Sequence, residues 1–229
     1  MDESVSDERS GSARWLTVHD DLLRGLTHAL SNRIGTIAAA SYLLASMPES
    51  LPSAAAALSD ESDRIDGQLQ LLRLLPRRPQ ALHEPVVPTD MTAQACALLR
   101  YHPDLGDVVV EIALDGDVQP AYADPTNTIL ALTVIVAVAQ RAAGQHGRVA
   151  LRIVCDTECV HFIATATYAD GSLADASAGH PDPDPDLDAD LAAVRWLLSS
   201  CGVEATGHAG GATMSLPTLQ AARRAQRDS

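Results

Sequence analysis

The chain has 229 residues and 46% of them are hydrophobic, so it can bury a core and is not disordered throughout. Its net charge of −14 at pH 7 argues against partners that are themselves negative, namely nucleic acids and anionic membrane surfaces. Only 3% of the residues are aromatic, so aliphatic side chains must build the core, as in helix bundles and plain α/β layers.

The N-terminal residues are acidic and polar and lack the basic start and apolar stretch of a secretory signal. We expect a disordered lead over residues 1–13. No uninterrupted run of 18 apolar residues occurs, which favours a cytoplasmic protein without a membrane span. The cysteines lack C-x2-C spacing and are expected to be buried or half-buried thiols: Cys96, Cys155, Cys159 and Cys201.

Residues 14–76 are predicted to form an antiparallel helical hairpin. Its first helix should begin at "WLTVHDDLL", with Thr17 as the N-cap and Asp20 at the capping-box position. Every seventh residue from Leu16 to Leu44 is aliphatic and takes heptad position a, which predicts a long seam for a partner helix. Prolines in "MPESLPS" should end this helix.

The second helix is expected over about residues 54–75, with one apolar face formed by Leu58, Ile65, Leu69, Leu72 and Leu75. One hairpin cannot cover its own apolar face. Two chains should therefore dock their hairpins into a four-helix bundle, which predicts a homodimer.

A proline-rich linker is expected over residues 77–88, an α/β domain over 89–217 and a tail over 218–229. The predicted elements of the domain are a helix from Thr89 or Asp90 to about Tyr101, a strand at 107–114, a helix at 126–144, a strand hairpin at 148–168, a helix at 187–202 and a strand at 210–219. This order predicts an α+β fold whose mixed sheet carries helices on one face. Residues 180–190 are expected to be an acidic loop.

The segment "HALSN" places His28 four residues before Asn32 on the first helix. Together with the order of hairpin, linker and α/β domain, it resembles the bacterial sensor histidine kinases. Those proteins join a dimerisation-and-phosphotransfer hairpin to a Bergerat-type ATP-binding domain. The resemblance covers roughly residues 15–217 and depends on element order more than on the short motif. It implies that His28 accepts a phosphoryl group and that Asn32 helps to position water in phosphatase reactions.

The chain departs from that family at four places that serve ATP. Ala29 stands where the kinases usually have an acidic general base, and Val134 and Val138 stand where asparagines hold magnesium and nucleotide. Of the D-x-G-x-G loop that binds adenine, at best Asp170 and Gly171 remain, out of register. A string of aspartates replaces the phosphate-binding glycine loop and would repel a triphosphate. We expect a degenerate domain without ATP binding, autophosphorylation, cofactor or metal, similar in plan to the dedicated histidine phosphotransferases of phosphorelays.

His28 falls at heptad position f, furthest from the seam, so its imidazole should face water beside Arg24 and Asn32. A neutral imidazole is a competent nucleophile toward an aspartyl phosphate. The receiver domain of a response regulator would supply the magnesium and the acidic pocket. Arg24, Arg33 and Gly35 are expected to form the face on which the receiver docks.

Three roles stay open on this evidence. The first is a histidine phosphotransferase acting through His28, with a histidine kinase as a second candidate partner. The second is a phosphatase of receiver aspartyl phosphate that uses Asn32. The third is a non-enzymatic dimeric adaptor, a pseudo-histidine kinase, because any surface helix can carry a histidine beside Arg and Asn. His19 is expected to be packed, and no role is assigned to His83, His102, His146, His161, His180 or His208.

Overall fold

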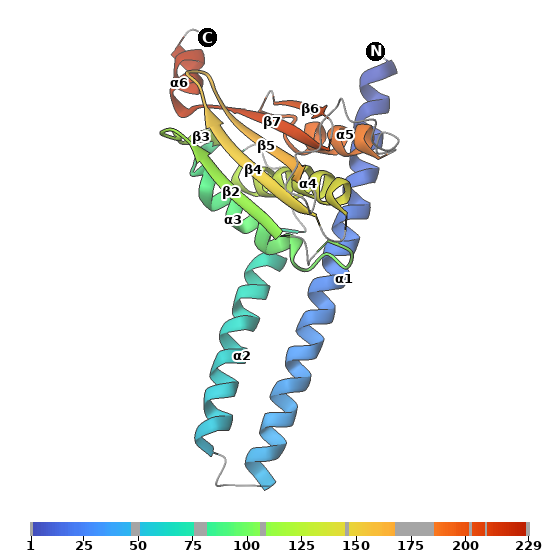
Figure 1. The fold of residues 1–229 in the computed structure, drawn as a ribbon, viewed down its shortest axis with the longest axis vertical. Coiled ribbons are helices and arrows are strands. Elements are labelled where there is room, and N and C mark those ends of the chain that lie inside the picture. The colour runs from blue at the N-terminus through green and yellow to red at the C-terminus, as the bar shows by residue number, and fades with distance from the viewer. Residues whose placement is uncertain are drawn as a thin grey trace.

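Two long helices form a hairpin that projects from an α/β domain (Figure 1). The helices are α1 (Asp2–Ser46) and α2 (Leu51–Leu72). The N-terminal half of α1 runs beside the domain, and its C-terminal half pairs with α2. The computed structural model describes residues 2–46, 51–75, 82–105, 109–144, 147–167, 186–201, 203–208 and 210–227.

Helix α1 starts well before the expected position, so the predictions of a disordered lead and of an N-cap at Thr17 are wrong. Gly11 within the predicted lead and Trp15 just after it are buried, so this part of the helix is held by packing. The Thr17 hydroxyl donates to the Ala13 carbonyl at 3.4 Å, as a threonine does inside a helix. Contact with the domain thus extends a helix that the polar lead would not form alone.

The buried positions of α2 recur every seven residues and are partly polar: Ala54, Glu61 and Gln68, followed by Leu75 just beyond the helix. The predicted apolar face is therefore only partly packed. Leu58, Ile65 and Leu72 are half-buried, and Leu69 keeps 42% of its surface exposed. The hairpin leaves an aliphatic stripe open within one chain.

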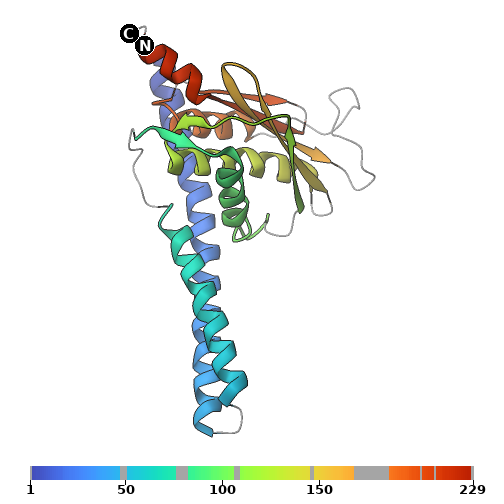
Figure 2. The ribbon, with the colours of Figure 1, turned by 90° about the vertical axis from the view of Figure 1, so that its left-hand side faces the viewer.

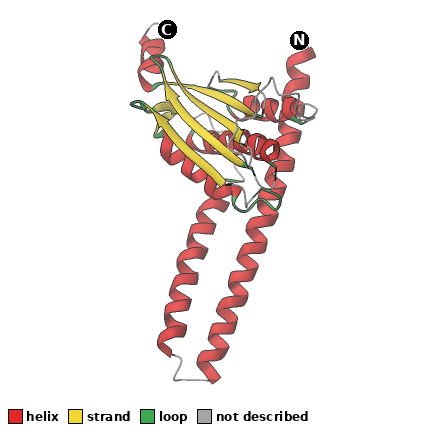
Figure 3. Ribbon diagram, viewed as in Figure 1, coloured by secondary structure: helices red, strands yellow, loops and turns green. Residues whose placement is uncertain are grey.

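The domain contains a five-stranded sheet in the order β2-β4-β5-β7-β6, with β2 parallel to β4 and all other pairs antiparallel. The strands are β2 (Val109–Asp115), β4 (Arg148–Cys155), β5 (Cys159–Thr167), β6 (Glu204–His208) and β7 (Gly211–Pro217). Helices α3 (Pro88–Leu99), α4 (Pro125–Ala143) and α5 (Leu187–Leu197) lie on one face of this sheet (Figures 2 and 3). The predicted α+β class with a mixed sheet is confirmed.

Helix α4 is the core helix of the domain. Asp124 caps it by accepting from the Asn127 backbone N–H at 2.8 Å, and Gly144 ends it at a φ of 68°. The helix is long and apolar enough to cross a membrane, but 83% of its apolar stretch is buried inside the domain. It packs against alternate residues of β4 and β5, such as Leu151 and Phe162, which are fully buried.

Several boundaries differ from the predictions. The linker predicted over 77–88 contains strand β1 (Glu84–Val86), which pairs with β3 (Ala121–Ala123), and Pro88 already starts α3; residues 77–81 lie outside the described part. The predicted tail contains α6 (Leu219–Arg227). Of the acidic loop, 180–185 lie outside the description and 187–190 begin α5.

Candidate functional site

His28 lies exposed on α1, as its heptad position predicts. The Asn32 side-chain amide Nδ2 lies 3.3 Å from His28 Nε2. In the neutral ring tautomer that carries its proton on Nδ1, the Nε2 lone pair accepts this hydrogen bond from the Asn32 amide. In that tautomer, an exposed imidazole nitrogen without a proton lies beside a hydrogen-bond donor.

Arg24 lies one turn before His28, and its side chain is 70% exposed. Its Nη1 is 3.3 Å from Oδ1 of the half-buried Asp21, and an ion pair at the protein surface contributes little to stability. The guanidinium is therefore available to an incoming anion near His28. A role of Arg24 in docking stays a prediction.

Arg33 is engaged inside the hairpin, which corrects its expected place as an open docking residue. Its Nη1 donates to Glu61 Oε2 at 2.8 Å, and Arg64 donates to the other oxygen at 2.9 Å. The pKa of the Glu61 carboxyl is lowered, chiefly because Arg33 donates to it and against the opposing effect of burial. The charge of Arg33 thus joins α1 to α2.

Gly35 faces open space, since a Cβ built on it would meet no atom within 4 Å. The surface one turn beyond Asn32 is therefore low, as expected. His19 packs edge-on against Trp15 with ring centroids 6.0 Å apart, so the prediction that it is a packed residue is confirmed. All four cysteines are half-buried free thiols, also as predicted.

The N-terminal half of α1 is clamped on the domain, which the sequence reasoning missed. A Cβ on Gly25 would lie 1.5 Å from the Tyr101 carbonyl oxygen, and one on Gly11 would lie 2.4 Å from that of Ala192. Side chains on the same face are buried: Trp15, Val18, Leu22 and Leu26. Their spacing of three and four residues marks a second helix face, different from the heptad seam.

A buried ion cluster completes this clamp. Asp190 of α5 is fully buried; Arg14 of α1 donates to it at 2.7 Å, and Arg141 at the end of α4 also pairs with it. Arg14 reaches Asp186 at 3.0 Å as well. One carboxylate thereby ties three helices together, and α1 cannot leave the domain without exposing unpaired charges.

His102 lies where the domain meets the hairpin. The Asp104 backbone N–H donates to its Nδ1 at 3.2 Å, and its Nε2 is 3.9 Å from the Asp21 carboxylate. Burial lowers the pKa of His102, while the nearby Asp21 opposes that shift. The ring is thus held neutral close to the α1 segment that carries Arg24 and His28.

Two positions at which the resemblance leads us to expect nucleotide-binding asparagines are apolar in this chain. Val134 and Val138 are 1% and 3% exposed inside the domain and offer no ligand atoms. Asp170 and Gly171 lie outside the described residues. Within the described ranges, no group of three or more His, Cys, Asp or Glu side chains is arranged to hold a metal ion.

No protein-family model and no curated protein matches the chain. Among solved structures, it is similar to the catalytic domain of the histidine kinase ThkA, at 13% identity and a TM-score of 0.44, over 61% of this chain and 96% of that one. A bacterial phosphotransferase matches at 15% identity and a TM-score of 0.44, and the match covers 87% of this chain and 95% of that one. A histidine kinase from Burkholderia phymatum STM815 matches at 14% identity and a TM-score of 0.42, and the match covers 95% of this chain and 98% of that one. At such low sequence identities and TM-scores, the function has to be argued from the residues of this chain.

Proposed function

We propose that the protein is a histidine phosphotransferase that passes phosphoryl groups to and from receiver aspartates through His28. The observation that carries this proposal is the exposed His28 ring with the Asn32 amide 3.3 Å from its Nε2. The other histidine of α1, His19, is packed against Trp15, keeps only 17% of its side chain exposed and has Nδ1 3.3 Å from Asp20 Oδ1.

The chemistry needs few groups from this chain. His28 Nε2 attacks the phosphorus of an aspartyl phosphate, the P–O bond to aspartate breaks, and a phosphohistidine forms. In the tautomer protonated on Nδ1, the Nε2 lone pair becomes available for attack when the Asn32 amide turns from Nε2 to the phosphoryl group, so the reaction needs no general base at the position of Ala29. Asn32 and Arg24 can then donate to the phosphoryl oxygens. The receiver supplies any magnesium.

We further propose that the domain binds no ATP and that His28 is charged by a partner. Buried Val134 and Val138 support this, since nothing at their positions can bind magnesium or phosphate. Saturable binding of ATP at micromolar concentration would contradict it.

The hairpin also favours a homodimer. Successive residues of an α-helix are rotated by 100° around its axis. The partly exposed aliphatic stripe of α1 therefore lies on the side opposite His28, and it includes Leu23, Leu30 and Ile34. A second hairpin on this stripe would complete a four-helix bundle and leave His28 and Gly35 facing a receiver. We propose this assembly for a cytoplasmic protein, with a receiver domain as the main partner and a histidine kinase as a second one.

The test is mass spectrometry at neutral pH, which preserves acid-labile phosphate, after mixing the protein with a panel of phosphorylated receivers. We expect phosphate on His28 from a receiver and none from ATP alone. His28→Ala should abolish it, whereas Ser31→Ala, a neighbouring exposed position, should not. If His28 carries no phosphate while a receiver loses its phosphate faster than it does alone, the result would favour the phosphatase. Asn32→Ala should then strongly reduce that phosphatase activity. No change with any receiver would favour the adaptor.

A further inference from the structure

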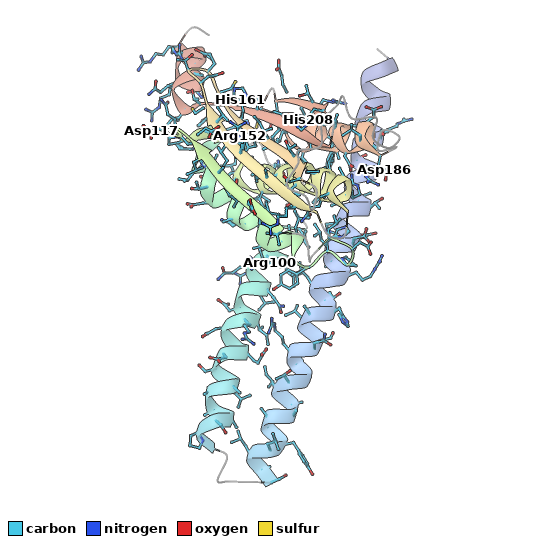
Figure 4. The ribbon with its side chains drawn as sticks, in the orientation of Figure 1. Arg100, Asp117, Arg152, His161, Asp186 and His208 are labelled. Carbon is cyan, nitrogen blue, oxygen red and sulfur yellow. The ribbon has the colours of Figure 1, made fainter. Side chains whose placement is uncertain are left out.

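The outer face of the sheet carries a hydrogen-bonded serine, histidine and aspartate. No described helix covers this face (Figure 2). His161 of β5 stands opposite Ser215 of β7, and its Nδ1 lies 2.8 Å from Ser215 Oγ. Its Nε2 lies 3.0 Å from Oδ2 of Asp156, in the turn between β4 and β5. His161 is 29% exposed, and Figure 4 shows it at the end of the sheet away from the hairpin.

The protons of this triad can be assigned. Oδ1 of Asp156 accepts from the backbone N–H groups of Glu158 and Cys159 at 2.8 and 2.7 Å, which leaves Oδ2 for His161. The hydrogen bond from His161, aided by these two amides, lowers the pKa of Asp156 to about 2, so it is a carboxylate at neutral pH. A carboxylate only accepts, so Nε2 of the neutral ring carries the proton and Nδ1 accepts from the Ser215 hydroxyl. This is the order of partners that activates a serine.

The surroundings limit which substrates can approach. Glu204 stands opposite Ser215 on β6. Burial, followed by the charges of Asp156, Glu204 and Glu158, raises the pKa of the Cys159 thiol. Cys159 therefore stays protonated and does not compete as a nucleophile. Glu158 is paired with Arg224 at 2.9 Å, so Asp156 and Glu204 are the carboxylates that would repel an anionic substrate.

We propose that Ser215 is a nucleophile toward small acyl esters that are uncharged or cationic, with His161 as its base and Asp156 as the residue that orients the ring. Ser215 Oγ attacks the ester carbonyl carbon, and its proton passes to His161 Nδ1. The carbon–oxygen bond to the leaving alcohol then breaks, and Nδ1 returns the proton to that alcohol. Water repeats the sequence on acyl-Ser215, which releases the acid and restores the serine.

The strand geometry predicts slow turnover. Ser215 lies within ladders that β7 forms with both β5 and β6, so the neighbouring amides are used within the sheet. The oxyanion would depend on water, and loss of one oxyanion donor costs roughly 100- to 1000-fold in rate. We therefore expect acylation by activated esters to be measurable and turnover of ordinary esters to be weak.

The experiment treats the full chain with an uncharged fluorophosphonate probe and maps the modified peptides by mass spectrometry. We expect Ser215 to be labelled at least tenfold faster than the exposed Ser200. His161→Gln and Asp156→Asn should each slow the labelling of Ser215 at least tenfold, whereas Thr213→Ala, two residues before Ser215 on the same strand, should not. Glu204→Gln should leave labelling by this uncharged probe unchanged and should speed labelling by an anionic fluorophosphonate severalfold, because it removes a negative charge beside Ser215.

Circular dichroism and urea midpoints establish that each variant is folded. If His161→Gln unfolds, Asp156→Asn on the exposed turn carries the same test. Labelling of Ser215 no faster than that of Ser200, or unchanged in the folded His161 or Asp156 variants, would overturn the proposal and leave the triad as a structural link between strands. An unchanged rate of labelling by the anionic probe in Glu204→Gln would overturn the charge preference.

Discussion

The geometry of His28 follows from helix spacing, because side chains four residues apart meet on one face. Its exposure and its neighbours Arg24 and Asn32 could therefore be predicted from the sequence. Arg33 was expected on the open docking face, but it lies inside the hairpin, as its heptad position d in the seam would indicate. A charged residue at such a position turns inward when the other helix offers a partner, and Glu61 is that partner. The partner could not be identified until the register between the two helices was known.

Replacing Gly35 with alanine separates helix stability from docking. Because Gly35 faces open space, Gly35→Ala should stabilise the hairpin by about 1 kcal/mol, as measured by urea unfolding. If a receiver loop needs the low surface there, phosphotransfer to His28 should slow. Gly67→Ala on α2 is the control: it is equally open and should stabilise the protein similarly without slowing transfer. Equal transfer rates in the two variants would remove Gly35 from the docking face.

His102 should make stability depend on pH. Its pKa is lowered in the folded protein relative to the ordinary value of 6.5, so the unfolded chain binds more protons below that pH. The stabilisation is present above pH 6.5 and is lost as pH falls from 6.5 through the lower folded pKa. We expect wild type to lose more stability than His102→Gln between pH 7.5 and 5.5, as measured by urea unfolding. A parallel decline in both proteins would contradict this assignment.

At the scale of elements, the sequence predicted those with strong periodic signals, including the hairpin helices, α4, the β4-β5 hairpin and β7. The strands that it missed are short or weakly patterned: β1, β3 and β6. They form because a neighbouring strand supplies hydrogen bonds, and that information is not local. Helix α6 was missed because its residues are mostly polar and form no buried face.

The clamp gives two glycines of α1 opposite responses to the same substitution. Gly25→Ala would press a methyl group into the Tyr101 carbonyl, so it should destabilise the protein by about 1–3 kcal/mol despite the better helix propensity of alanine. Gly35→Ala on the same helix is the matched control and should stabilise it. Urea midpoints of the two variants should therefore move in opposite directions. Stabilisation by Gly25→Ala would show that α1 is not held at Tyr101.

The ion cluster at Asp190 should be costly to break. Asp190→Asn leaves Arg14 and Arg141 without their shared carboxylate, and we expect a loss of about 3 kcal/mol in the free energy of unfolding. Asp188→Asn, an exposed aspartate of the same first turn, should change it by less than about 0.5 kcal/mol. Similar values for both variants would mean that the cluster contributes little to holding α1.

At the scale of the whole molecule, the aliphatic stripe can be tested as a dimer interface. Ile34 and Leu69 are 62% and 42% exposed in one chain, so Ile34→Glu and Leu69→Glu should leave the isolated chain folded. In a dimer, each carboxylate would enter an apolar seam and weaken association roughly tenfold to hundredfold. Analytical ultracentrifugation measures this. Leu82→Glu, at a 62% exposed position outside the hairpin, should have no effect, and a monomeric wild type would contradict the interface.

The contacts that hold the N-terminal half of α1 on the domain also fix the direction, around the helix axis, in which His28 points. Gly25 touches the domain only three residues before His28, a rise of about 4.5 Å along a continuous 45-residue rod. A shift of one residue in the seating of α1 would swing the imidazole by about 100° around the rod and turn it away from an approaching receiver. The α/β domain would thus determine the direction in which the histidine points, whether or not it binds a nucleotide.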